Sequence, residues 1–496
     1  MELEFGFWFF TASVGGLVAV CFVLKRANEW YHVSLLVGKQ NHSLPPGDLG
    51  WPLIGNMLSY LIAFKLGRPD SFIANFVTRT GAYKAYLFGS PTIIVTAPET
   101  CRPVLMDDAR FKPGWPKSTS TLMGRKSFLG LSAEENKRLR RLTAAPISGQ
   151  RALSAYHEFM KDVIVSSLDE LAKAEKPVEF LTEIRKITFK VIMHIFLGGE
   201  SGPMTESMEE EYARLNCGLR AMAINLPGFA YHKALKARKN LVKILRDVID
   251  RRRAKKEKVL LHEKMDMVDL LLDVEDDNGR KLDDEEITDV ILMYLNAGHE
   301  STAHATLWAI LFLYENPEYL QKAKAEQEEI LRRRSSMEEG LSLSEIKQME
   351  YLSKVIDETL RVVNVSLFTY REAKTDVNVY VRNFPFQGFT IPKGWKVLIW
   401  FRGVHLDPES YQNPKEFNPS RWNEGKPKKG AFIPFGTGSR LCPGSDLTKL
   451  ELSTFLHYFL LHYELERLNP GCAVGYLPHT RPKDNCLAKV KKSLSI

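Results

Sequence analysis

Two long apolar segments dominate the pattern of hydrophobic and polar positions along the chain. Residues 5–24 are twenty positions without a charge, and residues 287–314 are apolar on nearly all sides. About twenty apolar residues can cross the hydrocarbon core of a bilayer as a helix. A helix that is apolar all round in a globular chain runs through the core. The pattern therefore predicts a membrane-spanning helix at the N-terminus and a long buried helix in the second half.

The charges around the first segment favour an anchor over a cleaved signal peptide. Glu2 and Glu4 precede it, while Lys25 and Arg26 follow it, so the positive n-region of a signal peptide is missing. Positive charge after the segment places the rest of the chain in the cytosol. Residues 1–26 are thus predicted to be a single-pass anchor.

A proline-rich stretch follows this anchor. Pro45 and Pro46 fix φ and disfavour helix, so residues 27–55 are predicted to form a stiff hinge, with a plain linker as the alternative. After residue 55 no Gly/Ser/Pro-rich linker, repeat or low-complexity tract divides the chain. Residues 56–496 are therefore predicted to be one large domain, and a hydrophobic content of 44% suffices for its core.

The second apolar segment carries helix signals at both ends and polar residues in its middle. Acidic residues favour a helix start before it, and Pro317 ends it. Gly298 is unfavourable in a helix interior by about 1 kcal/mol relative to Ala, and Glu300, Ser301 and Thr302 follow it. A buried acid needs partners, and Ser or Thr can bend a helix by bonding the carbonyl four residues back. This pattern indicates either a kinked core helix whose polar groups satisfy one another, or a local bulge that admits O₂ and water.

Near the C-terminus one cysteine lies in a glycine-rich loop, which reads Phe435-Gly436-Thr437-Gly438-Ser439-Arg440-Leu441-Cys442-Pro443-Gly444. Glycine tolerates positive φ and lacks a Cβ, so such a loop can close around the sulfur and aim its N–H groups at it. Arg440 can bind an anion beside the sulfur. A thiolate ligand of haem iron needs these surroundings, whereas the alternative is an inert buried thiol.

The cysteine loop resembles the haem-binding signature of the cytochrome P450 family, and residues 297–301 resemble its oxygen-activation motif, A-G-x-[DE]-[TS]. The resemblance implies a mainly α fold with a smaller β region, a haem b cofactor, and O₂ as a substrate. Cys442 would be the axial thiolate ligand of the iron. The other residues carried over by position are the proton-delivery group Glu300, Ser301 and Thr302, the haem-loop residues Phe435, Gly438 and Gly444, and the haem-propionate arginines Arg140, Arg371 and Arg440.

Two further motifs belong to the same resemblance. Glu358 and Arg361 form an E-x-x-R pair on one helix face, and Arg421 lies in an F-x-P-x-R-W motif. We expect these three residues to form a structural charge network in the core. At a separate position, four residues before Arg140, the family has Trp or His, where this chain has Asn136, whose side chain lacks a ring.

Composition and charge narrow the classes of partner that the chain can bind. The net charge is +8, but the basic residues are interleaved with acids and no aromatic-basic module supports nucleic-acid binding. The six cysteines are scattered without a C-x-x-C pair, which suits a reducing compartment. No G-x-G-x-x-G fingerprint follows a predicted strand, so the electrons must come from another protein. The resemblance implies an NADPH–cytochrome P450 reductase at the endoplasmic reticulum membrane, docked at Lys426, Lys428 and Lys429 unless these are only a solvated charge run.

Longer segments resemble a plant branch of the family that oxidises hydrophobic terpenoids; they are residues 48–56, 111–116, 124–128, 227–232 and 476–482. The resemblance implies a diterpene acid that is oxidised in three successive steps. A triterpenoid hydroxylase is the alternative, favoured by Thr302-Ala303 where the diterpene branch has Ser-Gly. A haem isomerase or dehydratase that uses no O₂ is a third reading, which the intact acid–alcohol motif disfavours.

Specificity is expected to come from the loop at 112–128, from Met293 and Ala297 on the long helix, and from residues 363–370. Because the substrate would be a carboxylate, Lys117, Arg125 or Lys126 is a candidate counter-ion, with a solvated loop charge as the alternative. Residues 379–387 look like extra sequence, either a loop insertion or an error in the gene prediction.

Overall fold

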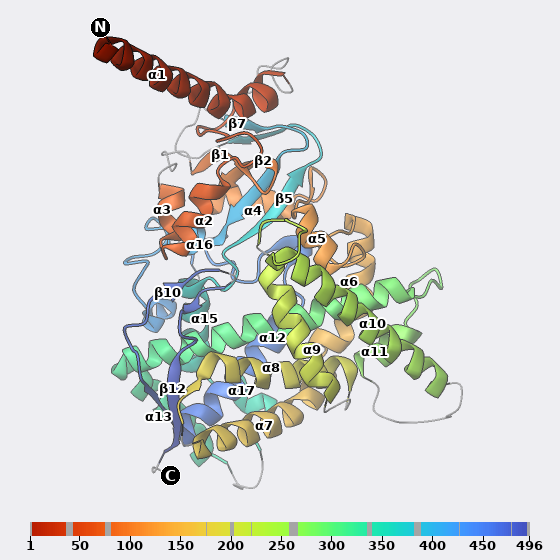
Figure 1. Ribbon diagram of the computed structural model, residues 1–496. Coiled ribbons are helices and arrows are strands. Elements are labelled where there is room, and N and C mark those ends of the chain that lie inside the picture. Colours follow the sequence, from red (N-terminus) through yellow and green to blue (C-terminus); the bar gives the residue numbers. More distant parts are fainter. Residues whose placement is uncertain are drawn as a thin grey trace. The chain divides into compact units, whose positions relative to one another are not determined.

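The computed structural model describes residues 2–35, 43–74, 81–174, 176–198, 203–219, 221–256, 266–334, 340–380, 388–425, 427–477 and 479–493. The chain divides into two compact units (Figure 1). The first comprises Met1–Pro116 and Phe368–Val404, and the second comprises Lys117–Leu367 and His405–Ile496. Of the predicted extra segment, Val379 lies in a strand, while residues 381–387 are outside the described residues. Lys426 is outside them as well.

The first unit combines short helices with most of the strands. Its elements are α1 (Glu2–Glu29), η1 (Trp30–Leu35), α2 (Met57–Lys65), α3 (Pro69–Ala74), β1 (Ala82–Leu87), β2 (Ser90–Val95), α4 (Pro98–Met106), β3 (Phe111–Pro113), β5 (Phe368–Ala373), β6 (Val377–Tyr380), β7 (Gly388–Ile391), β8 (Lys396–Trp400) and α16 (Phe401–His405), the last of which crosses the boundary. Five strands pair in the order β1-β2-β8-β5-β3, and β6 pairs with β7. Within the large sheet β2 and β8 run parallel, with Thr92 opposite Lys396, while the other pairs are antiparallel.

The sheet of the first unit is held by large buried side chains. Ile93, Ile94 and Val95 on β2 are fully buried, as is Trp400 at the end of β8. β-Branched residues suit such a pleated surface because they pack well against their neighbours.

The predicted proline hinge belongs to this unit and is hydrogen-bonded to its strands. The Pro46 carbonyl accepts a hydrogen bond from the Lys84 N–H at 2.8 Å, and the Ser43 carbonyl accepts one from the Thr390 N–H at 2.7 Å. Gly47 has φ +127°, and a Cβ there would lie 2.2 Å from the Lys84 carbonyl oxygen. Residues 43–47 are thus an arm that is hydrogen-bonded to both β1 and β7.

The N-terminal segment is helical, as predicted. α1 runs from Glu2 to Glu29 and so takes in Glu2, Glu4, Lys25 and Arg26 together with the apolar run. In the part of the chain that the structure describes, no helix is both long enough and apolar enough to cross a membrane.

The second unit is mostly helical. Its elements are α5 (Lys117–Met123), α6 (Ala133–Ser148), α7 (Gln150–Lys173), β4 (Val178–Glu179), α8 (Phe180–Leu197), α9 (Pro203–Leu219), α10 (Ala230–Lys256), α11 (Met267–Asp273), α12 (Asp284–Glu315), α13 (Pro317–Arg332), α14 (Leu343–Ile346), α15 (Glu350–Val363), η2 (Pro419–Glu424), η3 (Gly438–Arg440), α17 (Ser445–His462), β9 (Tyr463–Arg467), β10 (Val474–Gly475), β11 (Arg481–Pro482) and β12 (Leu487–Lys492). Strands pair as β4-β12-β9 and β10-β11. The predicted mainly α fold with a smaller β region is confirmed.

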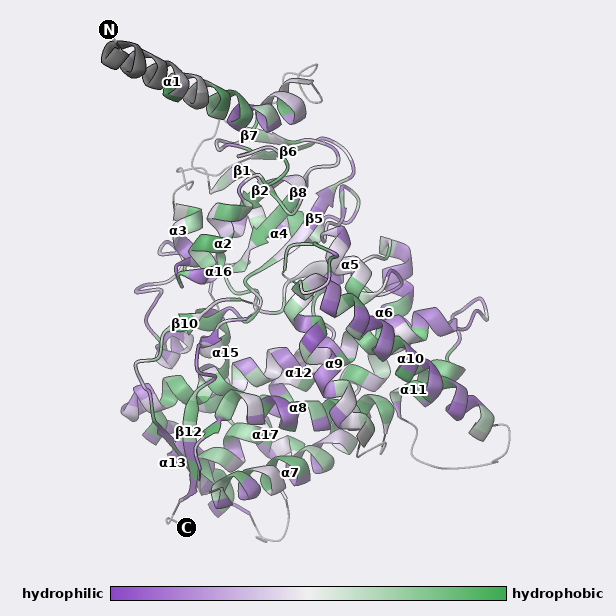
Figure 2. Ribbon diagram, viewed as in Figure 1, coloured by the Kyte–Doolittle hydropathy of each residue, from purple (hydrophilic) through white to green (hydrophobic). Residues whose placement is uncertain are grey.

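The long helix α12 is the centre of this second unit (Figure 1). It contacts α8, α10, α15 and α17, and its buried side chains belong to one continuous hydrophobic cluster. Asp283 and Glu286 form a capping box at its start, because each side chain accepts from the other residue's backbone N–H. The predicted buried helix at 287–314 is therefore confirmed, with about one extra turn at its N-terminus fixed by this cap. By contrast α10, which packs on α12 and α9, is largely hydrophilic (Figure 2).

Candidate active site

The loop before α17 presents Cys442 as its glycines predict. Gly436 and Gly438 have φ of +75° and +78°, which side chains other than glycine rarely adopt. The Cys442 N–H donates to the Phe435 carbonyl at 2.9 Å and closes the loop. Burial raises the pKa of the Cys442 thiol, while the Gly444 N–H and the positive charge of Arg140 act in the opposite direction. Both opposing groups favour a thiolate, so a metal ion that removes the proton would find a prepared ligand.

An open stripe interrupts the burial of α12. Ala297 is exposed and Met293 and Ser301 are half-exposed, although the residues between them are mostly buried. Spacing of four residues places these three side chains on one face of the helix. The predicted pocket face around Met293 and Ala297 is therefore the open face of α12.

The two candidate alcohols differ in environment. The Ser301 hydroxyl donates to the Ala297 carbonyl at 2.7 Å and lies on the open stripe. The Thr302 hydroxyl donates to the Gly298 carbonyl at 2.8 Å, and Thr302 is only 1% exposed. Both make the bond to the carbonyl four residues back that bends a helix, but only Ser301 faces open space.

Glu300 is buried beside an arginine that the sequence analysis did not single out. Its Oε2 lies 3.2 Å from Arg185 Nε on α8. His304 and His299 lie near the same carboxylate, at 3.6 Å and 3.8 Å. Burial raises the pKa of Glu300, but Arg185 and, to a smaller extent, the neighbouring histidines act together in the opposite direction and lower that pKa to about 2. Glu300 is therefore an ionised carboxylate at neutral pH.

His304 supports this ion pair as a neutral ring. Its Nδ1 lies 2.6 Å from the Glu300 carbonyl oxygen, and its Nε2 lies 3.4 Å from Arg185 Nη2. Because the carbonyl can only accept, Nδ1 donates and Nε2 accepts from the guanidinium. Burial lowers the pKa of His304 to about 4, in keeping with this tautomer.

Two of the three predicted propionate arginines lie in the second unit. Arg440 Nη1 donates to the Phe128 carbonyl at 3.0 Å and to Asn136 Oδ1 at 3.2 Å, and its Nη2 donates to the Leu131 carbonyl at 3.0 Å. The Arg140 guanidinium lies over the Phe128 ring, 5.6 Å from its centroid. Arg371 lies on β5 in the first unit, where Nη2 donates to the Leu105 carbonyl at 3.4 Å, and its role toward a propionate stays a prediction.

These surroundings fit haem b. A Cβ added at Gly436 or Gly444 would meet nothing within 4 Å, so the loop faces open space around Cys442. Leu441 in the same loop is 43% exposed, which leaves an apolar side chain for a flat apolar ring to cover. The guanidinium groups of Arg140 and Arg440 supply the planar donors that bind carboxylates.

The predicted charge network in the core is confirmed. Glu358 and Arg361 are fully buried, with Nη2 and Oε1 2.7 Å apart, and Arg421 Nε lies 3.2 Å from the same oxygen. Arg361 Nη1 also donates to the carbonyls of His405 and Pro414. The Ile433 N–H donates to His405 Nε2 at 3.0 Å. This network therefore fixes the chain just before the cysteine loop.

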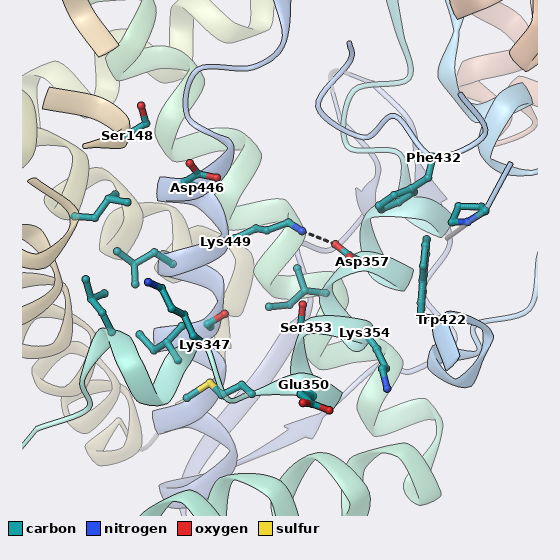
Figure 3. Close-up of a pocket in the computed structure, with 18 of the residues that line it drawn as sticks. Ser148, Lys347, Glu350, Ser353, Lys354, Asp357, Trp422, Phe432, Asp446 and Lys449 are labelled. Carbon is teal, nitrogen blue, oxygen red and sulfur yellow. Dashed lines mark hydrogen bonds and ion pairs between the residues drawn. The ribbon is translucent and has the colours of Figure 1, made fainter. Parts of the chain in front are cut away.

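A cavity of about 1020 Å³ lies against α14, α15, η2 and α17 (Figure 3). Lysines are frequent in its lining, which includes Lys347, Lys354, Lys428, Lys429 and Lys449. Lys449 Nζ is paired with Asp357 at 2.8 Å. The predicted docking lysines Lys428 and Lys429 are exposed at this cavity, so they lie where a protein partner can reach them.

The candidate counter-ions for a carboxylate substrate are less well placed. Lys126 Nζ lies 2.6 Å from Asp283 Oδ2 and 3.3 Å from Glu285 Oε2, so its charge is already paired. Lys117 and Arg125 are exposed side chains.

Comparison with known proteins gives a consistent result. The family model described as "Cytochrome P450" matches residues 45–473. Ent-kaurenoic acid oxidase 2 of Arabidopsis thaliana is 56% identical over 488 residues, which cover 98% of each chain. 7,8-Epoxymelianol synthase CYP88A154 of Ailanthus altissima is 54% identical over 497 residues, 99% of this chain and 98% of that protein. The solved structure of retinoic acid-bound cyanobacterial CYP120A1 superposes with a TM-score of 0.79 at 28% identity, over 91% of this chain and 100% of that one.

Proposed function

Because this chain is a member of the cytochrome P450 family, whose enzymes are haem b monooxygenases with a cysteine thiolate ligand, we propose that it oxidises a terpenoid and that its substrate is ent-kaurenoic acid. The product would be gibberellin A12, reached in three successive oxidation steps. The identity of 56% to an ent-kaurenoic acid oxidase over nearly the whole of both chains carries this proposal.

Residues of the second unit would hold the cofactor. Cys442 Sγ would bind the iron, while Phe435, Gly438 and Gly444 would shape the loop beneath it. Arg140 and Arg440 would bind the propionates, with Arg371 as a third cation. When bound, thiolate-ligated haem supplies the activation of O₂ that oxidation of an unactivated C–H bond requires.

The proton-handling residues would act from α12. Each oxidation of a C–H bond to an alcohol consumes O₂, two electrons and two protons and releases one water. Ser301 would present its hydroxyl on the open stripe, where the oxygen can accept a hydrogen bond while its proton is bonded to the Ala297 carbonyl. Glu300 would supply a fixed negative charge next to Ser301, because the Arg185 charge keeps it ionised. Thr302 would contribute by holding the bend at Gly298.

A triterpenoid oxidase is the second candidate. The 7,8-epoxymelianol synthase relative is nearly as similar, at 54% identity. Thr302-Ala303 on α12 supports this candidate as a departure from the Ser-Gly that the resemblance implies for the diterpene branch.

Turnover of ent-kaurenoic acid by membranes that carry this chain, a reductase and NADPH tests the proposal. A reduced carbon-monoxide difference spectrum first establishes folded, thiolate-ligated haem. Oxidation through to gibberellin A12 is the expected result. A normal spectrum without diterpene turnover, combined with turnover of a triterpene alcohol, would overturn the substrate and keep the chemistry.

We further propose an NADPH–cytochrome P450 reductase as the electron donor, docked over Lys428 and Lys429. The cavity beside these lysines and their exposure support this surface, because an acidic partner is attracted to exposed cations. Electron-transfer rates should fall as salt rises, and Lys428→Gln with Lys429→Gln should weaken that dependence. Electron-transfer rates that change neither with salt nor with these substitutions would contradict docking there.

We also propose that the chain works at the endoplasmic reticulum membrane, with residues 27–55 as the hinge and 56–496 as the catalytic domain. The uncharged run at 5–24, followed by Lys25 and Arg26, supports this location. The full chain should stay with membranes after alkaline carbonate washing. Release into the supernatant would contradict the location.

A further inference from the structure

A buried carboxylate on α12, Asp289, joins three parts of the second unit. Asp289 is 1% exposed. Its Oδ2 accepts a hydrogen bond from the Lys126 backbone N–H at 3.0 Å, in the segment between α5 and α6. Its Oδ1 accepts one from Arg238 Nη2 on α10 at 2.6 Å. A buried charge with two well-formed partners is costly to disturb, since removing it leaves a buried donor without an acceptor.

The segment at 124–131 is shaped around this carboxylate. Gly124 has φ +96°, and a Cβ there would lie 2.0 Å from Asp289 Cγ. Any side chain at this position must therefore push the turn away from α12. The turn is closed further by the Ser127 hydroxyl, which donates to the Gly124 carbonyl at 2.7 Å.

The same segment reaches the proposed haem arginines a few residues later. The carbonyls of Phe128 and Leu131 each accept a hydrogen bond from Arg440 at 3.0 Å. The Phe128 ring lies beneath the Arg140 guanidinium and also packs on Tyr294 of α12, with the ring centroids 5.5 Å apart. An unbroken series of contacts thus leads from Asp289 through the turn to both arginines.

The other contacts between the segment at 124–131 and α12 are weaker than those of Asp289. Lys126 Nζ pairs with Asp283 and Glu285, but these acidic side chains are 52% and 55% exposed. Exposed ion pairs contribute only about 0–1 kcal/mol. They border a cavity of about 700 Å³ whose lining also includes Arg246 and Arg253. The buried carboxylate, and not this exposed cluster, is therefore the firm attachment of the segment to α12.

We propose that Asp289 is a positioning residue for the haem site, because it fixes the segment at 124–131 on α12 and thereby orients Arg440 and Arg140 toward the haem propionates. The proposal rests on the proposed haem-binding role of these arginines. A brace that serves only α10 through Arg238 is the competing role for Asp289.

Three substitutions separate the two roles. Asp289→Ala removes the hydrogen bonds to both Lys126 and Arg238, Gly124→Ala forces the turn and the Asp289 carboxylate apart, and Arg238→Gln removes only the hydrogen bond from α10. Glu285→Gln is the matched control, because it removes an exposed partner of Lys126 from the same helix. Each purified haem-loaded protein is compared with the wild type by its rate of haem transfer to excess apomyoglobin and by its propionate-bending bands in resonance Raman spectra.

A positioning role predicts that Asp289→Ala and Gly124→Ala both raise the haem-transfer rate, by about tenfold for a loss of roughly 1.4 kcal/mol, and shift the propionate bands. Arg238→Gln and Glu285→Gln should leave both readouts at the wild-type values. If Asp289→Ala does not fold, Gly124→Ala decides, and Arg238→Gln shows separately what the loss of the α10 contact alone does.

Two results would overturn the proposal. One is a Gly124→Ala protein with wild-type haem transfer and wild-type propionate bands. The other is an Arg238→Gln protein that loses haem as fast as Asp289→Ala. A wild-type chain that takes up no haem would instead overturn the proposed function itself, so the two failures are distinguishable.

Discussion

Asn136 Oδ1 on α6 accepts a hydrogen bond from Arg440 Nη1 at 3.2 Å, although these residues lie far apart in the sequence. Asn136 is 2% exposed and stands where the resemblance places Trp or His. Its amide oxygen therefore orients an arginine of the cysteine loop, a role that an indole N–H cannot take because it only donates.

Asn136→Ala should weaken haem retention modestly. Arg440 keeps its bonds to the carbonyls of Phe128 and Leu131, so only one hydrogen bond of about 1 kcal/mol is lost. Haem transfer to apomyoglobin should accelerate about fivefold, the rate equivalent of that energy. Asn136→Asp is the matched variant, since a carboxylate keeps the acceptor, and it should stay at the wild-type rate or below it. If Asn136→Asp loses haem faster than Asn136→Ala, this role of Asn136 is contradicted.

Ser301→Ala should impair catalysis far more than Thr302→Val. The Ser301 hydroxyl lies on the open stripe, whereas the Thr302 hydroxyl is buried against the Gly298 carbonyl. Positioned proton transfer contributes about 10²–10⁴-fold, so Ser301→Ala should lower kcat by about 10²-fold. Product formed per NADPH consumed should fall with it. Equal losses for the two variants would show that the helix bend matters and the exposed hydroxyl does not.

Arg185→Gln should destabilise the protein near neutral pH. The pKa of Glu300 is about 2 in the folded chain, against 4.5 as its ordinary value. A depressed folded pKa contributes stability above pH 4.5 that is lost as pH falls toward 2, and 2.5 units correspond to about 3 kcal/mol. Without Arg185, burial raises the pKa of Glu300. The ionised carboxylate then lowers the stability of the folded chain near neutral pH instead of raising it. The melting temperature of Arg185→Gln should therefore fall below that of the wild type at pH 7, with a smaller gap at pH 4.

Lys186→Gln is the matched control for this experiment, because Lys186 is the exposed next residue and its ion pair is with Glu183 on its own helix. Its melting temperature should stay close to the wild type at both pH values. A uniform loss for Arg185→Gln at pH 7 and pH 4 would indicate lost packing and not a lost charge pair.

Glu451→Gln should stabilise the protein. Glu451 on α17 is 2% exposed, and neither carboxylate oxygen has a hydrogen-bond partner among the described residues. Burial raises its pKa from 4.5 to about 8, so the folded chain holds this proton at pH 7 while the unfolded chain releases it. Stability is therefore lost as pH rises from 4.5 toward 8, by about 3 kcal/mol at pH 7. The Gln variant should unfold at a higher temperature at pH 7, and the difference should vanish near pH 4.

Features set by neighbours along the chain could be predicted from the sequence. The buried run and its acidic start define α12 to within a few residues, because a helix cap acts only over its first turn. The glycine spacing in the cysteine loop likewise gives positive φ at Gly436 and Gly438. The E-x-x-R pair lies on one face because the residues are three apart on a helix.

Features set by contacts between distant parts of the chain could not be predicted from the sequence. Arg185 looks like any helical surface arginine until α8 packs on α12 and brings it to Glu300. Lys126 looks like a loop cation available for a substrate carboxylate, yet the folded segment places it between Asp283 and Glu285. In the sequence Asn136 reads as the loss of an aromatic ring, whereas the folded chain places it in hydrogen-bond contact with Arg440. Each partner depends on how helices pack, which local pattern does not encode.

The bonded arm at 43–47 has a practical consequence for shortened forms of the protein. Ser43 and Pro46 supply carbonyls to Thr390 on β7 and Lys84 on β1, so a cut just before the globular part at residue 56 would leave two strand N–H groups to water. It would also remove the close packing of Gly47 against the Lys84 backbone. A shortened form for crystallisation should therefore start at or before Ser43, which retains the hydrogen bonds of the arm to β1 and β7 and protects these two strands from pairing with another molecule.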